Sequence, residues 1–201
     1  MRTRHARWPR LALAAAAAAA ATGTLAPARA SLLVALDMSA MVERADTVAV
    51  VDVASARAAW DARHERIVTT VELTVVESWK GSAAPAARLV VAQPGGTVGD
   101  VTMTVLGMPR FSPGERALVF LHGPADRAAV VGLAQGKRAL RLDPAGGWIV
   151  GAPERAGAAF VRTAASAARV PVLEAVSRPL DDVRAEVRAA IRAQSDRGGA
   201  R

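Results

Sequence analysis

Short apolar segments separated by turn residues fill the middle of this sequence and leave no room for helices between them. Clusters such as Pro94-Gly95-Gly96 and Asp143-Pro144-Ala145-Gly146-Gly147 are typical of tight turns. Because a crossover between parallel strands needs a dozen or more residues, this spacing excludes a parallel α/β sheet. It predicts an all-β, mainly antiparallel domain. Its six short strands are expected over residues 88–92, 101–105, 117–121, 129–133, 137–142 and 148–150.

Two further apolar segments precede these strands and predict the form of the sheet. Residues Thr47–Val53 are rich in β-branched side chains, and Arg66–Trp79 alternates apolar with polar residues over an unusual length. Val68 and Val76 interrupt the alternation, as a strand bent around a small barrel would tolerate. We therefore expect an OB-like closed barrel. The residues expected on one face of the long strand are Ile67, Thr69, Val71, Leu73, Val75 and Trp79.

Helices are expected only at the two ends of this domain. Asp37 is a suitable N-cap for a short helix ending near Ala45, and residues 31–36 before it form either a short strand or an irregular lead-in. A second helix is expected over residues 180–194, with one apolar stripe made by Leu180, Val183, Val187 and Ile191. We expect that stripe to pack on the barrel; a detached helix that docks on a partner is the alternative.

The N-terminus has the pattern of a secretory signal peptide over residues 1–30. A basic stretch is followed by an unbroken apolar run of 11 residues from Leu11 to Ala21, and Ala28-Arg29-Ala30 forms a small-residue cleavage site. The run is shorter than the roughly 20 residues that cross a bilayer, so a cleaved signal is preferred to a membrane anchor. The expected location is the periplasm or the outside of the cell, with no stable membrane span after cleavage. The domain organisation expected downstream is a barrel domain with its N-terminal helix over 31–151, an Ala-rich linker over 152–179, the helix over 180–194 and a disordered tail over 195–201.

The charge and the cysteine content limit the partners. The formal net charge is +8, but the signal segment holds five arginines and no acid, which leaves 21 basic and 18 acidic residues in the remainder. A net charge of about +3 does not produce the strong positive field that phosphate backbones need, so nucleic acid is not an expected partner. The absence of cysteine excludes disulfides and a lipid anchor on cysteine.

Several blocks between Ala45 and Asp143 resemble a family of exported bacterial proteins of uncharacterised function. The blocks cover residues 45–53, 66–81, 89–100, 107–121 and 132–143 in this order. The most specific part is Gly107-Met108-Pro109-Arg110-Phe111-Ser112-Pro113-Gly114-Glu115, the strand that follows it, and Gly132-Leu133-Ala134-Gln135-Gly136-Lys137. The resemblance covers about half of the chain. It implies export and a β-fold, and it implies no activity.

A weaker resemblance is to the netrin and metalloproteinase-inhibitor type of OB-fold barrel. It rests on the strand Thr47–Val53, on the long strand that ends in Lys80-Gly81, and on Gly114-Glu115 before the next strand. Those inhibitors rely on an N-terminal cysteine and on disulfides, which this chain lacks. The resemblance therefore implies the barrel and does not imply protease inhibition by that mechanism.

No catalytic set, metal site or cofactor site is predicted. Beyond the signal segment the only histidines are His64, in a charged turn, and His122, at a strand end, and their spacing is not that of metal ligands. No constrained Ser nucleophile is present. Carboxylate pairs of the kind used in glycoside hydrolysis can be drawn from many acids, Glu115 among them, so they have no specificity.

Three glycine-containing loop segments are the candidate ligand-binding residues instead. Glycine permits close backbone approach, while arginine, glutamine and lysine are long hydrogen-bond donors. One interpretation is that these loops converge on a binding lip. The other is that they are tight turns, with Phe111 closing one end of the barrel and Glu115 meeting Arg110 or Lys137. The candidate residues are Gly95, Gly96, Arg110, Phe111, Gln135 and Lys137.

These observations favour a non-catalytic exported module that binds a protein or an envelope polymer. One alternative is a carboxylate-based hydrolase. Another is an accessory subunit that docks on a larger assembly through its C-terminal helix.

Overall fold

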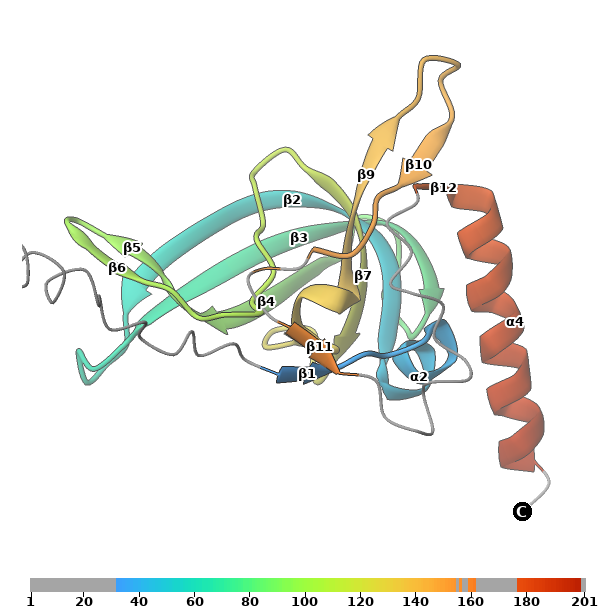
Figure 1. Cartoon of the computed structure of the whole chain (residues 1–201), viewed down its shortest axis with the longest axis horizontal. Helices are drawn as coiled ribbons and strands as arrows, with labels where there is room; N and C mark the ends of the chain where they lie inside the picture. The colour runs from blue at the N-terminus through green and yellow to red at the C-terminus, as the bar shows by residue number, and fades with distance from the viewer. Residues whose placement is uncertain (1–31, 155, 157–158, 162–176, 200–201) are drawn as a thin grey trace, which may run out of the picture.

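A mainly antiparallel β-sheet of eight strands, with a short helix and a long helix on one side, forms the body of the protein (Figure 1). The computed structural model describes residues 32–154, 156, 159–161 and 177–199. The predicted signal peptide therefore lies outside the described residues. Within them, no helix is both long enough and apolar enough to cross a membrane. The helices and strands are β1 (Leu32–Val34), α2 (Met38–Arg44), β2 (Thr47–Trp60), β3 (Ile67–Lys80), β4 (Arg88–Pro94), β5 (Gly96–Val98), β6 (Val101–Met103), β7 (Arg116–His122), β8 (Ala129–Val130), the 3-10 helix η1 (Leu133–Gly136), β9 (Lys137–Leu142), β10 (Trp148–Val150), β11 (Ala159–Val161), β12 (Arg178–Pro179) and α4 (Leu180–Gly199).

The main sheet is open, so the expected closed barrel is wrong. The strand order is β12-β10-β9-β7-β2-β3-β4, and β8 pairs beside β9 on the same β7 strand. The edge strand β4 meets the chain just before β8 through one isolated bridge, Val91–Ala128, with Ala128 N donating to Val90 O at 2.8 Å. Because β8 has only two residues, the chain there is too short to form the ladder that would close the sheet.

Apolar side chains are buried on both faces of the sheet. On the face toward the helices, Val48, Val50, Leu118 and Phe120 pack with residues of α2 and α4. The other face of the same strands contributes Ala49, Val51, Val53, Ala117, Val119 and Leu121 to a second core. The central strands β2 and β7 therefore have nearly continuous apolar runs, as expected for strands that are covered on both sides.

Irregular pairing between β2 and β3 moves one predicted core residue to the other face. Val71, Leu73 and Val75 are buried in the second core as expected, but Trp79 lies in the core beneath the helices. Val50 on β2 pairs with Glu77, but the next residue, Val51, pairs with Val75. Val76 is therefore an extra residue on β3 with no partner on β2. A β-bulge of this kind inverts the side-chain alternation that follows it. The interruption of the apolar and polar alternation at Val76 in the sequence coincides with this bulge.

The N-terminal helix was predicted correctly, and it completes the core on the helix side. Asp37 caps α2, since its Oδ1 accepts a hydrogen bond from Ala40 N at 2.7 Å. The preceding segment forms β1, which pairs in parallel with β11. This short parallel pair was not expected from the strand spacing.

The C-terminal helix packs on the sheet, as its apolar stripe predicts. Leu180, Val183 and Val187 are buried in the core beneath the helices. The helix continues to Gly199, so residues 195–199 are helical and the expected disordered tail is wrong over that range. The segment 152–179 also differs from a plain linker, because it contains β11 and β12.

An ion pair between β2 and β7 predicts a pH dependence of stability. Arg116 donates two hydrogen bonds of 2.7 Å to the carboxylate of Asp52, and its guanidinium carbon lies 4.8 Å from the centre of the Trp148 ring. The hydrogen bonds from Arg116 lower the pKa of Asp52 below its usual value. The pair therefore stabilises the fold above the ordinary aspartate pKa of about 3.9, and this contribution is lost as the pH falls through the lowered pKa.

We expect Asp52→Asn to lower the free energy of unfolding at pH 7 by at most about 1 kcal/mol, because the side chain of Asp52 is 44% exposed. The difference between the wild type and the variant should shrink as the pH falls through the lowered pKa of Asp52, because the wild-type carboxylate then becomes protonated as well. Urea unfolding at pH 7 and at a series of acidic pH values measures this. A difference that stays constant with pH would contradict the ionic origin.

Candidate functional site

A pocket of about 380 Å³ lies between the β5–β6 hairpin and the loop of residues 104–112. Gly95, Gly96, Arg110 and Phe111, four of the predicted site residues, line it. The rest of the lining mixes hydroxyl groups, as in Thr69 on β3, with apolar side chains such as Met103. Two of the three predicted loops therefore converge on one cavity.

The pocket exists because the chain turns sharply after β4 and crosses the sheet in direct contact with it. Gly95 N donates to Ile67 O at 2.8 Å, and the Thr69 hydroxyl donates to Gly95 O at 2.6 Å. Gly96 has a φ of +131°, and a Cβ atom on it would lie 2.6 Å from Thr69 Oγ1 and 2.7 Å from the Cβ of Ala58. A side chain at this position would push the hairpin off the sheet, so Gly96 sets the floor of the pocket.

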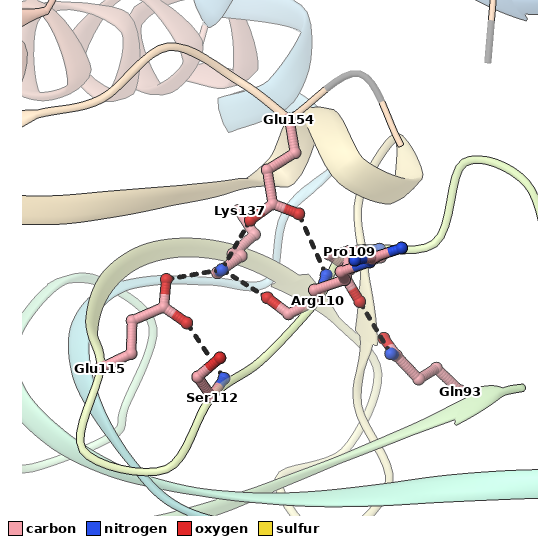
Figure 2. A network of polar contacts seen from close by, with 7 residues as sticks. All are labelled: Gln93, Pro109, Arg110, Ser112, Glu115, Lys137 and Glu154. Carbon is pink, nitrogen blue, oxygen red and sulfur yellow. Dashed lines mark hydrogen bonds and ion pairs between the residues drawn. The ribbon is translucent and has the colours of Figure 1, made fainter. Parts of the chain in front are cut away.

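A buried lysine holds the other wall of the pocket (Figure 2). The side chain of Lys137 is 2% exposed, and its Nζ lies 2.6 Å from Glu115 Oε1 and 2.8 Å from Glu154 Oε1. It also donates to Arg110 O, and it lies 5.3 Å from the centre of the Phe111 ring. The predicted contact between Glu115 and Lys137 is confirmed. Lys137 therefore joins the loop of residues 104–112 to β9 and to Glu154, in the chain after β10.

The remaining oxygens of the two carboxylates fix the same loop. Glu154 Oε2 accepts from Arg110 N at 3.1 Å, and Glu115 Oε2 accepts from Ser112 N at 3.1 Å. Gln93 on β4 donates to Pro109 O at 2.8 Å. Figure 2 shows these contacts following one another along the loop. The backbone of Arg110 is thus held on both sides.

Gln135 lies elsewhere and does not line the pocket. Its side chain is 2% exposed, accepts from Leu36 N at 2.9 Å and donates to Val34 O at 3.0 Å. It supplies the backbone of the N-terminal segment with the partners that a neighbouring strand would give. Lys137 is not a lining residue either. For these two residues the structure therefore gives an internal structural role.

The guanidinium of Arg110 remains available at the pocket. Arg110 is exposed, and within the described residues its side chain has no ionic or hydrogen-bonding partner. Its hydrogen bonds with Glu154 and Lys137 are both made by its backbone. The site therefore presents one unpaired positive charge on a rigidly held backbone, beside hydroxyl and apolar groups.

Sequence reasoning missed Glu154, Gln93 and Thr69. Glu154 falls in the segment interpreted as a linker, and nothing around it predicts a contact with Lys137. Thr69 was placed on the correct strand, but its role depends on the hairpin that crosses over it. Both contacts depend on tertiary packing, which no local pattern describes.

The described residues contain no group of three or more His, Cys, Asp or Glu side chains that could hold a metal ion. His64 stacks on Trp60 with ring centres 6.2 Å apart, and His122 is an exposed residue at the end of β7. Glu115 and Glu154 are both paired with Lys137. The chemistry that this arrangement offers is recognition by one cation, hydroxyl groups and an apolar wall.

Comparison with known proteins gives no match to a family model, to a curated protein or to a solved structure. The resemblances noted in the sequence remain predictions.

Proposed function

We propose that this protein is an exported, non-catalytic binding module for a protein or an envelope polymer, and that the pocket beside the β5–β6 hairpin is its binding site. The observation that carries this proposal is the unpaired Arg110 guanidinium on a loop whose backbone is fixed by Lys137, Glu115 and Glu154. A fixed backbone lowers the entropy lost when a ligand binds, which favours recognition.

The free charge at the pocket indicates an anionic partner. Arginine binds carboxylate or phosphate oxygens through charge-assisted hydrogen bonds. Polar groups such as the hydroxyl of Thr97 and apolar groups such as Phe111 line the same cavity. We infer a ligand that carries an acidic group next to both polar and apolar surface.

The two alternative functions have less support. A carboxylate-based hydrolase would use acids such as Glu115, but Glu115 and Glu154 each form an ion pair with Lys137, and both help to hold the loop. An accessory subunit that docks through its C-terminal helix needs a free apolar stripe, whereas Leu180, Val183 and Val187 are buried against the sheet.

The experiment compares Arg110→Ala with Arg192→Ala, an exposed arginine on α4. Partners of the tagged protein are crosslinked in cells and identified by mass spectrometry, and the affinity of each purified partner is then measured for both variants. We expect Arg110→Ala to weaken binding about tenfold or more, because a hydrogen bond to a charged group contributes about 1.5–3 kcal/mol. The free energy of unfolding should change by no more than about 0.5 kcal/mol.

Arg192→Ala should bind like the wild type. Equal binding by Arg110→Ala and the wild type would contradict the pocket as the binding site. Turnover of a substrate that is abolished by Glu115→Gln, with the melting temperature unchanged, would support the hydrolase instead.

A further inference from the structure

The distal half of β2 has a free edge. β7 pairs with β2 only from Thr47 to Asp52, and the last bonds on that side join Val53 to Glu115 and Gly114. β2 continues to Trp60, and Figure 1 shows β2 and β3 extending together beyond β7. No other strand in the described part of the chain pairs with this side of Ala54–Trp60.

The pairing pattern identifies the backbone groups that face outward. Asp61 N donates to Arg66 O, so these two residues form a hydrogen-bonded pair at the end of the hairpin. Such pairs alternate along an antiparallel ladder, so Ser55, Arg57 and Ala59 bond to β3. The N–H and C=O groups of Ala56, Ala58 and Trp60 then point away from β3, toward the free edge.

The free edge adjoins the pocket. Gly96, which lines the pocket, sits over the Cβ of Ala58, and Phe111 packs on the same core as Ala56. A strand added to β2 would therefore direct alternate side chains to the face of the sheet that carries the pocket. Its other side chains would lie on the opposite face, beside Arg57.

The surroundings of this edge carry unpaired positive charge. Arg57 and Arg63 are exposed, and their side chains have no ionic or hydrogen-bonding partner within the described residues. Asp61 is paired with Arg66, which leaves Glu65 as the acid that offsets one of these charges at the hairpin tip. Arg110 adds a third unpaired arginine at the adjoining pocket. The edge is therefore complementary to an acidic strand.

We propose that an extended peptide segment of a partner protein, with acidic and apolar residues in alternation, binds here by adding a strand to the edge of β2 from Ala54 to Trp60. Backbone hydrogen bonds to Ala56, Ala58 and Trp60 supply the affinity, and alternate side chains supply the specificity. The alternating acidic residues face Arg57, and the apolar residues face Ala56, Ala58 and the apolar lining of the pocket, such as Phe111. The acidic group that the proposed function places at Arg110 lies at the end of the segment that enters the pocket. This inference rests on the proposed binding function and names the partner.

A second copy of this chain is a poorer occupant of the edge. Symmetric pairing of two β2 strands would bring one Arg57 close to the other, and like charges on facing strands are destabilising. An acidic segment would instead place an opposite charge across from Arg57, which stabilises the pairing. The charge of the edge thus favours a different protein as the partner.

The first test measures hydrogen exchange of individual β2 amides by NMR, with a blocked synthetic peptide of alternating Glu and Val as the probe. In the free protein, the amides of Arg57 and Ala59 should exchange slowly and those of Ala56 and Ala58 rapidly. Bound peptide should protect Ala56 and Ala58. Peptides that are N-methylated at every second amide provide the matched control. Methylation of the amides that face β2 should abolish binding, whereas methylation of the amides that face away from β2 should leave binding unchanged.

Two variants test the edge itself. Ala58→Pro removes an outward N–H, which an edge strand tolerates, so it should keep the fold and abolish peptide binding. Ala59→Pro is its structural control, because the N–H that it removes points toward β3, and it should destabilise the fold. Arg57→Glu leaves the edge intact and should weaken binding of the Glu–Val peptide about fivefold, while a Lys–Val peptide gains affinity.

Each contrary outcome overturns the inference in a recognisable way. Peptide binding without protection of Ala56 and Ala58, or binding unchanged by Ala58→Pro, excludes strand addition and leaves the pocket proposal standing. No binding of the Glu–Val peptide excludes an acidic segment as the occupant. Protection that rises with protein concentration in the absence of peptide assigns the edge to a second copy.

Discussion

Lys137→Met should lower the free energy of unfolding by about 3–5 kcal/mol. Methionine fills much of the volume of the lysine stem, but it leaves Glu115, Glu154 and the carbonyl of Arg110 without their common partner. Removal of one member of a buried ion pair is costly in this range because the remaining charge is left uncompensated. Chemical denaturation at pH 7 measures the change.

Two further variants separate the part of this stability loss that comes from the unpaired carboxylates from the part that any lysine-to-methionine change would cause. Adding Glu115→Gln to Lys137→Met removes one stranded charge and should recover part of the loss. Lys80→Met is the matched lysine control, since within the described residues Lys80 Nζ donates to the neutral groups Val42 O and Gln194 Oε1, and the carboxylates of Asp46 and Glu43 act on it without a direct ion pair. It should cost less than Lys137→Met. A loss below about 1 kcal/mol for Lys137→Met would mean that solvent already compensates both carboxylates.

Gly136→Ala should be the second most damaging change, with a loss at or above the upper end of the roughly 1–3 kcal/mol typical of overpacking. A Cβ atom on Gly136 would lie 2.1 Å from Val131 O, a backbone atom that cannot rotate away. The substitution must therefore displace η1 or the chain before it, next to both Gln135 and Lys137. The melting temperature and the unfolding free energy report the effect.

Gly198→Ala is the matched control for this substitution. Gly198 is in α4, and a Cβ atom on it meets nothing within 4 Å. Alanine is favoured over glycine in a helix by about 1 kcal/mol, so this variant should be as stable as the wild type or more stable. A Gly136→Ala protein with wild-type stability would show that η1 has room to move.

The sequence predicted the strands and helices well where a local pattern determines them. Asp37 precedes α2 as its cap, and the alternation from Ile67 to Val75 identified buried residues of β3. The bulge at Val76 was visible as a break in the pattern, but its consequence for Trp79 depends on the pairing with β2. Closure of the sheet depends on the two-residue length of β8, which a run of apolar residues over 129–133 does not reveal.

The candidate site was also predicted only where a local sequence pattern determines it. Gly95, Gly96, Arg110 and Phe111 line one pocket because turn residues stand at loop positions that the strand spacing already identified. Gln135 and Lys137 have long polar side chains in a glycine-containing loop, a pattern that suits a ligand site and an internal anchor equally. Their partners Leu36 and Glu154 are distant in sequence, so burial could not be inferred.

The helix-side core imposes an order on folding. Met41 and Val42 of α2 pack in the same cluster as Val183 and Val187 of α4, and Gln135 bonds to Leu36 across 99 positions of sequence. Contacts of such separation slow folding because the loop between them must close first. As the chain emerges from the ribosome, α2 and the helix-facing side of β2 must wait for α4, which follows every strand of the sheet. Until then Met41 and Val42 lack the part of their packing that α4 supplies, so the nascent protein stays in a partly folded form until the end of its synthesis.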